Sequence, residues 1–118
     1  MASADRFVLN IKGVGCHGSS PEKGVDPVTI VSNIVLALQT VIAREISALH
    51  SGVLTIGKIS GGFSYNVIPN NVEIEGTIRT LDANIRQYIA KRVEEIAKSV
   101  AATFRGSCDV EIDWGAPR

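Results

Sequence analysis

The order in which the apolar residues change their spacing limits the folds open to this chain. Alternation at every second residue, typical of a strand with one buried face, runs through 7–12, 72–79 and 108–114. Steps of three and four, typical of amphipathic helices, run through 27–46 and 85–104. The segment 53–59 is rich in β-branched residues and is predicted to be a further strand.

The resulting order, strand, helix, strand, strand, helix, strand, is that of the ferredoxin-like βαββαβ fold. We therefore expect an α+β domain with a four-stranded antiparallel sheet and two helices on one face. Right-handed crossovers give the spatial order 4-1-3-2 for strands numbered along the chain. The start of the first strand and the end of the fourth then lie side by side, as an inserted domain requires.

Several residues predict local structure at the ends of these elements. Asp26 and Asp82 are expected to cap the two helices, and Pro27 suits a first helical position. Gly106 follows the last apolar residue of the second helix and is expected to adopt the left-handed conformation. Gly76, in the middle of a strand, indicates a bulge or the close approach of another group.

The predicted arrangement leaves 53–59 as an edge strand beside the broadly apolar helix 27–46. An uncovered edge of β-branched residues is a ready site for pairing with another strand. Two-fold pairing would join two copies through one continuous sheet. We therefore expect a homodimer formed by the edge strand 53–59 and the first helix.

Charge and composition exclude several classes of function. Lys and Arg number 12 and Asp and Glu number 12, which gives no basic face for nucleic acid or a membrane surface. We find no apolar run that reaches the ~20 residues of a membrane span. Two cysteines and a start without signal-peptide character lead us to expect a reduced, cytoplasmic setting. None of the common metal-ligand, phosphate-loop or nucleophile motifs occurs, so no metal site is expected within this chain.

Three polar residues are candidates for function, each with a plainer alternative. His17, held among glycines, could bond to neighbouring backbone or donate to an oxyanion brought by another molecule. Asn66 could stabilise its own turn or bind a ligand. Arg79 could pair with a glutamate across the sheet or hold a substrate carboxylate. The chemistry of the residues alone leaves these alternatives open.

Three stretches together resemble a known family. They are Gly13-x-Gly15-Cys16-His17-Gly18-Ser19-Ser20-Pro21 with Asp26-Pro27-Val28, then Leu38-Gln39-Thr40-Val41-Ile42-Ala43-Arg44, then Gly61-Gly62-Phe63-Ser64-Tyr65-Asn66-Val67-Ile68-Pro69 with Gly76-Thr77-Ile78-Arg79. Their order and spacing resemble the dimerisation, or lid, domain of the aminoacylase and carboxypeptidase-type metal-dependent amidohydrolases. The branch that they resemble most contains hippurate hydrolases, auxin-conjugate hydrolases and N-acyl-amino-acid deacetylases.

The resemblance implies that 1–118 is a single lid domain of a larger hydrolase whose catalytic domain lies outside this sequence. That parent would hydrolyse the amide bond of N-acyl amino acids or small peptides, and this domain alone would be inactive. A divalent metal, zinc, manganese or similar, would belong to the catalytic domain.

By the same resemblance, His17 would stabilise the oxyanion in the partner subunit's site, and Asn66 and Arg79 would bind substrate. Glu22 and Cys16 depart from the commonest pattern, which leaves the substrate preference open. The main alternative function is a stand-alone ferredoxin-like module that binds a small molecule by itself. A purely structural dimerisation piece is a further alternative.

Overall fold

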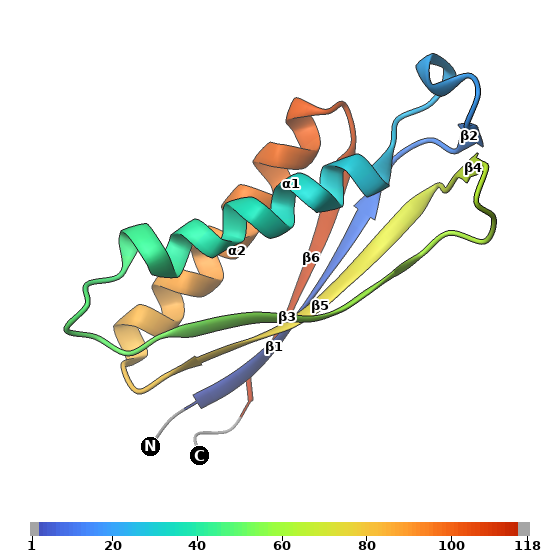
Figure 1. The fold of residues 1–118 in the computed structure, drawn as a ribbon. Helices are drawn as coiled ribbons and strands as arrows, with labels where there is room; N and C mark the ends of the chain where they lie inside the picture. The colour runs from blue at the N-terminus through green and yellow to red at the C-terminus, as the bar shows by residue number, and fades with distance from the viewer. Residues whose placement is uncertain (1–2, 116–118) are drawn as a thin grey trace.

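A four-stranded antiparallel sheet with two helices on one face forms the body of the molecule (Figure 1). The computed structural model describes residues 3–115. The strands are ordered β3 (Val53–Gly61), β5 (Asn71–Thr80), β1 (Ser3–Lys12) and β6 (Ser107–Asp113). The helices α1 (Pro27–Thr40) and α2 (Ala83–Thr103) lie across this sheet. The ferredoxin-like fold and the strand order 4-1-3-2 are confirmed.

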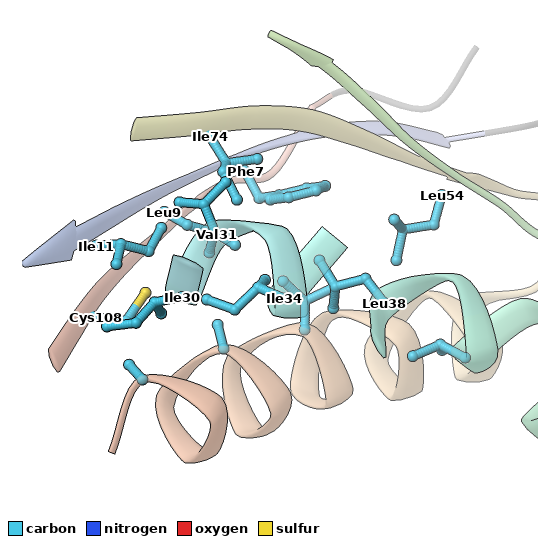
Figure 2. Close-up of a cluster of buried hydrophobic side chains, with 14 of the residues drawn as sticks. Phe7, Leu9, Ile11, Ile30, Val31, Ile34, Leu38, Leu54, Ile74 and Cys108 are labelled. Carbon is cyan, nitrogen blue, oxygen red and sulfur yellow. The ribbon is translucent and has the colours of Figure 1, made fainter. Parts of the chain in front are cut away.

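The core lies between the sheet and the two helices (Figure 2). Alternate residues of the central strand β1, namely Phe7, Leu9 and Ile11, are fully buried. Ile30 and Ile34 of α1 meet this layer and are also fully buried. The period-two and helical patterns in the sequence therefore predicted the faces that are buried.

A bulge at Gly57 changes which side chains of β3 face the helices. The pairing of β3 with β5 shifts register between Ile56 and Lys58. Without this extra residue, Lys58 would follow Ile56 onto the helix-facing side. With it, Ile59 lies opposite Ile74 and faces the helices. The bulge is thus in the strand next to Gly76, at which we had expected a bulge or a close approach.

Gly76 itself is a point of close approach. A Cβ atom on this residue would lie 2.3 Å from the Thr55 carbonyl oxygen and 2.4 Å from Cζ of Phe7. Such distances are far below van der Waals contact, so the sheet and the Phe7 ring require glycine here.

The helix starts follow the predicted caps. The Asp26 side chain accepts a hydrogen bond from the Val28 N–H, and Pro27 is the first residue of α1. Asp82 accepts from the N–H groups of Asn84 and Ile85 at the start of α2. Helix α1 continues into a π-helical turn, η2 (Val41–Glu45), which places its end near residue 46 as predicted.

The prediction for Gly106 is wrong. Arg105 adopts the left-handed conformation, with φ of 71°. Gly106 is needed for a different reason, because a Cβ there would lie 2.6 Å from Cδ1 of Ile30 and 2.7 Å from the carbonyl oxygen of Lys12. Close packing of the loop on α1 and β1 therefore explains this glycine.

The segment Pro27–Glu45 is apolar on more sides than packing on the sheet requires. Its mean hydropathy of 1.5 and its length of 19 residues would allow it to cross a membrane by length and composition alone. A third of this segment (33%) is buried, including Ile34 and Leu38 against the core. Core helices of soluble proteins pass the same test, and the surplus here includes Leu36, which is 71% exposed.

A buried ion pair ties together the start of β1, the start of α2 and the residue after Trp114. Asp5 is 1% exposed, and both of its oxygens accept hydrogen bonds of 2.7 Å from Arg86. Asp5 also accepts from the Gly115 N–H at 2.9 Å, and the Arg86 guanidinium lies 4.9 Å from the centre of the Trp114 ring. The hydrogen bond to Asp5 raises the pKa of Arg86. We call Asp5, Arg86, Trp114 and Gly115 the basal clamp.

Candidate functional site

The candidate site is built from two loops at the end of the sheet away from the basal clamp (Figure 1). We call residues 13–24 and 62–70 the distal tip. Within it, β2 (Cys16–His17) pairs antiparallel with β4 (Val67–Ile68), and the short 3-10 turn η1 (Pro21–Lys23) follows β2. The tip is thus a small two-stranded extension of the domain.

The glycines of the first loop allow it to lie directly on the second. The N–H groups of Gly13 and Gly15 donate to the backbone oxygen and to Oδ1 of Asn70, at 2.8 and 2.9 Å. The N–H of Gly18 donates to the Asn66 carbonyl oxygen at 2.8 Å. A Cβ on Gly18 would lie 3.0 Å from that oxygen, so a larger residue would push the loops apart. These N–H groups are occupied within the protein and form no cradle for a phosphate.

The tip brings His17 and Asn66 together. His17 lies opposite Val67 in the strand pair, and the next residue bonds to Asn66. Both side chains also bond to a serine two residues away. His17 Nδ1 accepts from the Ser19 N–H at 3.1 Å and lies 2.8 Å from Ser19 Oγ. Asn66 Oδ1 accepts from Ser64 Oγ at 2.8 Å.

The sequence reasoning had singled out neither serine. The available signal was their spacing, because short hydroxyl side chains two residues from a polar group often bond to it locally. His17 and Asn66 therefore do make some of the local hydrogen bonds that we considered as the plainer alternative to a functional role. Nδ1 of the histidine has a backbone donor, while Nε2 bonds to no group in residues 3–115.

Two aromatic side chains flank this pair of residues on the surface. Phe63 is 81% exposed and Tyr65 is 100% exposed, so neither packs within its own loop. A hollow of about 330 Å³ lies between this loop and the start of α1, and Asn66 and Asp26 are among its lining residues. The tip therefore offers an exposed surface with both polar and aromatic groups.

Arg79 lies far from the distal tip. It is exposed near the end of β5, where it pairs with Ala4 and Val53. Arg79 lies nine positions after Asn70 along an extended strand, which corresponds to about 30 Å at the usual rise of ~3.3 Å per residue. One chain therefore does not bring Arg79 to His17.

Arg79 also lacks the cross-strand glutamate that we considered. Glu75 on the open face of the sheet pairs with Arg6 and with Lys58. The hydrogen bond from Arg6 is the main cause that lowers the pKa of Glu75. Within the described part of the chain, no carboxylate lies within ion-pair distance of Arg79.

An apolar groove of about 500 Å³ runs between α1 and β3. Its lining residues are Val28, Val31, Ser32, Val35, Leu36, Ile59, Gly61 and Val72. Ile59, which the bulge turns toward this groove, is 53% exposed. The outer edge of β3 pairs with no strand among residues 3–115. We call this surface the α1–β3 groove.

Neither the cysteines nor the acidic residues form a metal site in the described residues. No group of three or more His, Cys, Asp or Glu side chains in residues 3–115 could hold a metal ion. Burial raises the pKa of the Cys108 thiol to about 11, so it stays protonated at neutral pH. Both cysteines are free thiols.

Comparison with known proteins gives a family match over most of the chain. The model of the peptidase dimerisation domain matches residues 3–105. The chain is 40% identical over 117 residues to the N-acetyl-L-cysteine deacetylase of Bacillus subtilis. The aligned region covers 99% of this chain and 28% of that protein.

Two solved structures share the fold. A chain from methicillin-resistant Staphylococcus aureus, assigned as an aminohydrolase, superposes with a TM-score of 0.94 at 35% identity, covering 98% of this chain and 30% of its own. A dinuclear metal-binding peptidase of the M20 family from Bacillus subtilis superposes with a TM-score of 0.76 at 29% identity, covering 99% and 27%. The chain thus spans less than a third of the length of the relatives that it matches.

Proposed function

Because this chain belongs to the peptidase dimerisation domain family, we propose that it joins two subunits of a metal-dependent amidohydrolase and caps the substrate. The family resemblance noted from the sequence is confirmed. The parent enzyme would be a cytoplasmic hydrolase that cleaves the amide bond of N-acyl amino acids or small peptides. Deacetylase and peptidase relatives support this class of reaction.

The α1–β3 groove supports a homodimer. The outer edge of β3 lies beside an exposed apolar groove. A second copy could pair with this edge and also cover the groove. Pairing of β3 with the β3 strand of a second copy would extend the sheet across both subunits. The side chains of Leu36 and Ile59, which line the groove, would then be buried in the interface.

The single observation that carries the proposed division of labour is the separation of the candidate residues. His17 and Asn66 lie at the distal tip, whereas Arg79 lies about 30 Å away along β5. A site that needs all three is therefore completed by two chains. In the proposal, Arg79 holds the substrate carboxylate in its own subunit, while His17 and Asn66 reach the site of the partner.

Each residue would act through groups that this chain supplies. A guanidinium can hold a carboxylate with two parallel hydrogen bonds. The ring N–H of His17 would donate to the oxygen that becomes negative as the amide carbonyl is attacked. The described residues do not fit a metal, so we assign any metal to chain outside this sequence and no step to it here.

Mixed dimers of the longer protein test this arrangement. One subunit carries His17→Ala and the other Arg79→Ala, with different tags so that heterodimers can be purified. If the sites are shared as proposed, one site has both residues intact and the other lacks both. We expect the heterodimer to show about half of the wild-type kcat, while each variant homodimer is nearly inactive.

Sharing between subunits would be refuted by a heterodimer no more active than the two homodimers. Reassembled dimers with His17→Ala in both subunits, carrying the two tags, control for the tags and for the purification.

A further inference from the structure

We propose that Ser19 and Ser64 are positioning residues that turn the N–H groups of His17 and Asn66 outward. The distal tip would then present hydrogen-bond donors and would bind an acceptor, the oxygen of a carbonyl or carboxylate. The positioning follows from local contacts, and only the identity of that oxygen rests on the proposed function.

The contacts of His17 determine which ring nitrogen carries hydrogen. A backbone N–H can only donate, and that of Ser19 points at Nδ1 from 3.1 Å. Nδ1 of the neutral ring must therefore be the acceptor, and the hydrogen lies on Nε2. The Ser19 hydroxyl, 2.8 Å from the same atom, then also donates to it. The ring is left with Nε2–H as its outward group.

Asn66 is held in a matching way. The Ser64 hydroxyl donates to Oδ1 at 2.8 Å, which occupies the acceptor end of the amide. Its backbone oxygen accepts from the Gly18 N–H, so the residue is fixed beside the β2–β4 pair. The free end of the amide is the NH₂ group, which carries two donors.

The two serines together select the kind of ligand. With Nδ1 of His17 and one lone pair of Asn66 Oδ1 occupied, the two side chains present mainly N–H groups toward solvent. Such an arrangement suits a carbonyl, carboxylate or oxyanion, and it leaves His17 no ring-nitrogen lone pair with which to bind a metal ion.

Nuclear magnetic resonance of the chain labelled with ¹⁵N tests the histidine directly. Ring nitrogens with and without hydrogen have distinct shifts, and His50→Gln separates the signals of the two histidines. We expect the neutral His17 ring to carry hydrogen on Nε2. Ser19→Ala should change the ratio of the two tautomers about two- to tenfold, the size expected for one neutral hydrogen bond.

Matched variants separate positioning from a general effect on the loop. Ser20→Ala makes the same change one residue away, where the hydroxyl bonds to no described residue, and it should leave the spectrum unchanged. Ser19→Thr keeps both donors and should restore the wild-type ratio. A wild-type ring with hydrogen on Nδ1, or a Ser19→Ala spectrum equal to that of Ser20→Ala, would overturn the positioning of His17.

Kinetics of the longer enzyme provide the second test. Ser19→Ala should lower kcat about two- to tenfold with little change in KM, because an oxyanion donor acts mainly in the transition state. Ser64→Ala should raise KM by a similar factor, since Asn66 contacts the bound substrate, and Ser64→Thr should restore it. Ser60→Ala is its matched control, because that exposed hydroxyl has no described partner.

The positioning by the serines and the proposed function can be refuted separately. If Ser64→Ala has the same KM as Ser60→Ala, the positioning of Asn66 is refuted. If full-length His17→Ala keeps its activity, the proposed function is refuted, while the ring spectrum still decides whether Ser19 positions the histidine.

Discussion

Gly76 and Gly57 are neighbouring glycines in the sheet with opposite tolerance for a side chain. A Cβ on Gly76 would overlap the Thr55 carbonyl and the Phe7 ring, whereas a Cβ on Gly57 would meet no atom within 4 Å. Both have negative φ, because Gly62 is the only described glycine with positive φ. Space, and not backbone conformation, therefore separates the two positions.

Gly76→Ala should destabilise the chain by about 3 kcal/mol, at the upper end of overpacking costs, because a carbonyl of the adjacent strand cannot rotate away. Gly57→Ala should change the free energy of unfolding by no more than about 0.5 kcal/mol. Urea denaturation of both variants measures these values. Equal effects at the two positions would show that the close contacts at Gly76 are relieved at little cost.

At the scale of the elements, α2 begins at Asp82, a carboxylate whose pKa differs between the folded and the unfolded state. The N–H groups of Ile85 and Asn84 bond to Asp82 and lower its pKa below its usual range, with Ile85 the larger cause. A carboxyl group whose pKa is lower in the folded state stabilises the fold above its unfolded pKa. That contribution is lost as the pH falls through the folded pKa.

Asp82→Asn should therefore reduce the loss of stability below about pH 4 relative to wild type. The asparagine oxygen can still cap the helix, so stability at neutral pH should be largely kept. Urea denaturation from pH 7 to pH 2 provides the measurement. Glu45 and Asp109 also have lowered pKa values, so the difference between the two proteins is the relevant quantity. Parallel curves would contradict a role for Asp82.

The elements could be predicted from sequence because each has a repeating signal. Phe7, Leu9 and Ile11 alternate, and Asp26 and Asp82 cap helices by short contacts within the chain. The bulge at Gly57 has no such signal, since a one-residue register shift depends on the partner strand. The left-handed Arg105 was also missed, because Gly106 offered the more usual conformation while tertiary packing required its small size.

For the molecule as a whole, the α1–β3 groove predicts the oligomeric state. Leu36→Lys and Ile59→Lys, alone or together, should convert a dimer into monomers, because each places a charge where apolar groups would be buried. Ala102→Lys adds the same charge on the exposed surface of α2 and should leave the dimer intact. Sedimentation velocity at micromolar concentrations measures the result. Dimers that persist in the double variant would exclude this groove as the interface.

The candidate site was only partly predictable from the sequence. The strand order predicted from the sequence places the loops that carry His17 and Asn66 at one end of the sheet and Arg79 near the other end. Asn70 was missed, because its role depends on how two loops distant in sequence lie against each other. Ser19 and Ser64 were missed although each bonds to a residue two positions away in its own loop. The roles of His17, Asn66 and Arg79 in catalysis remain predictions for the experiments above.

The basal clamp has a mechanical consequence for a molecule measuring 50 × 24 × 18 Å. The hydrogen bonds of the clamp join β1, through Asp5, to Arg86 of α2 and to Gly115 after β6. The first and last strands are therefore held to each other and to α2. The distal tip lies at the opposite end of the domain from the clamp. Any rotation of the domain about the clamp would therefore displace His17 by more than it displaces residues close to the clamp.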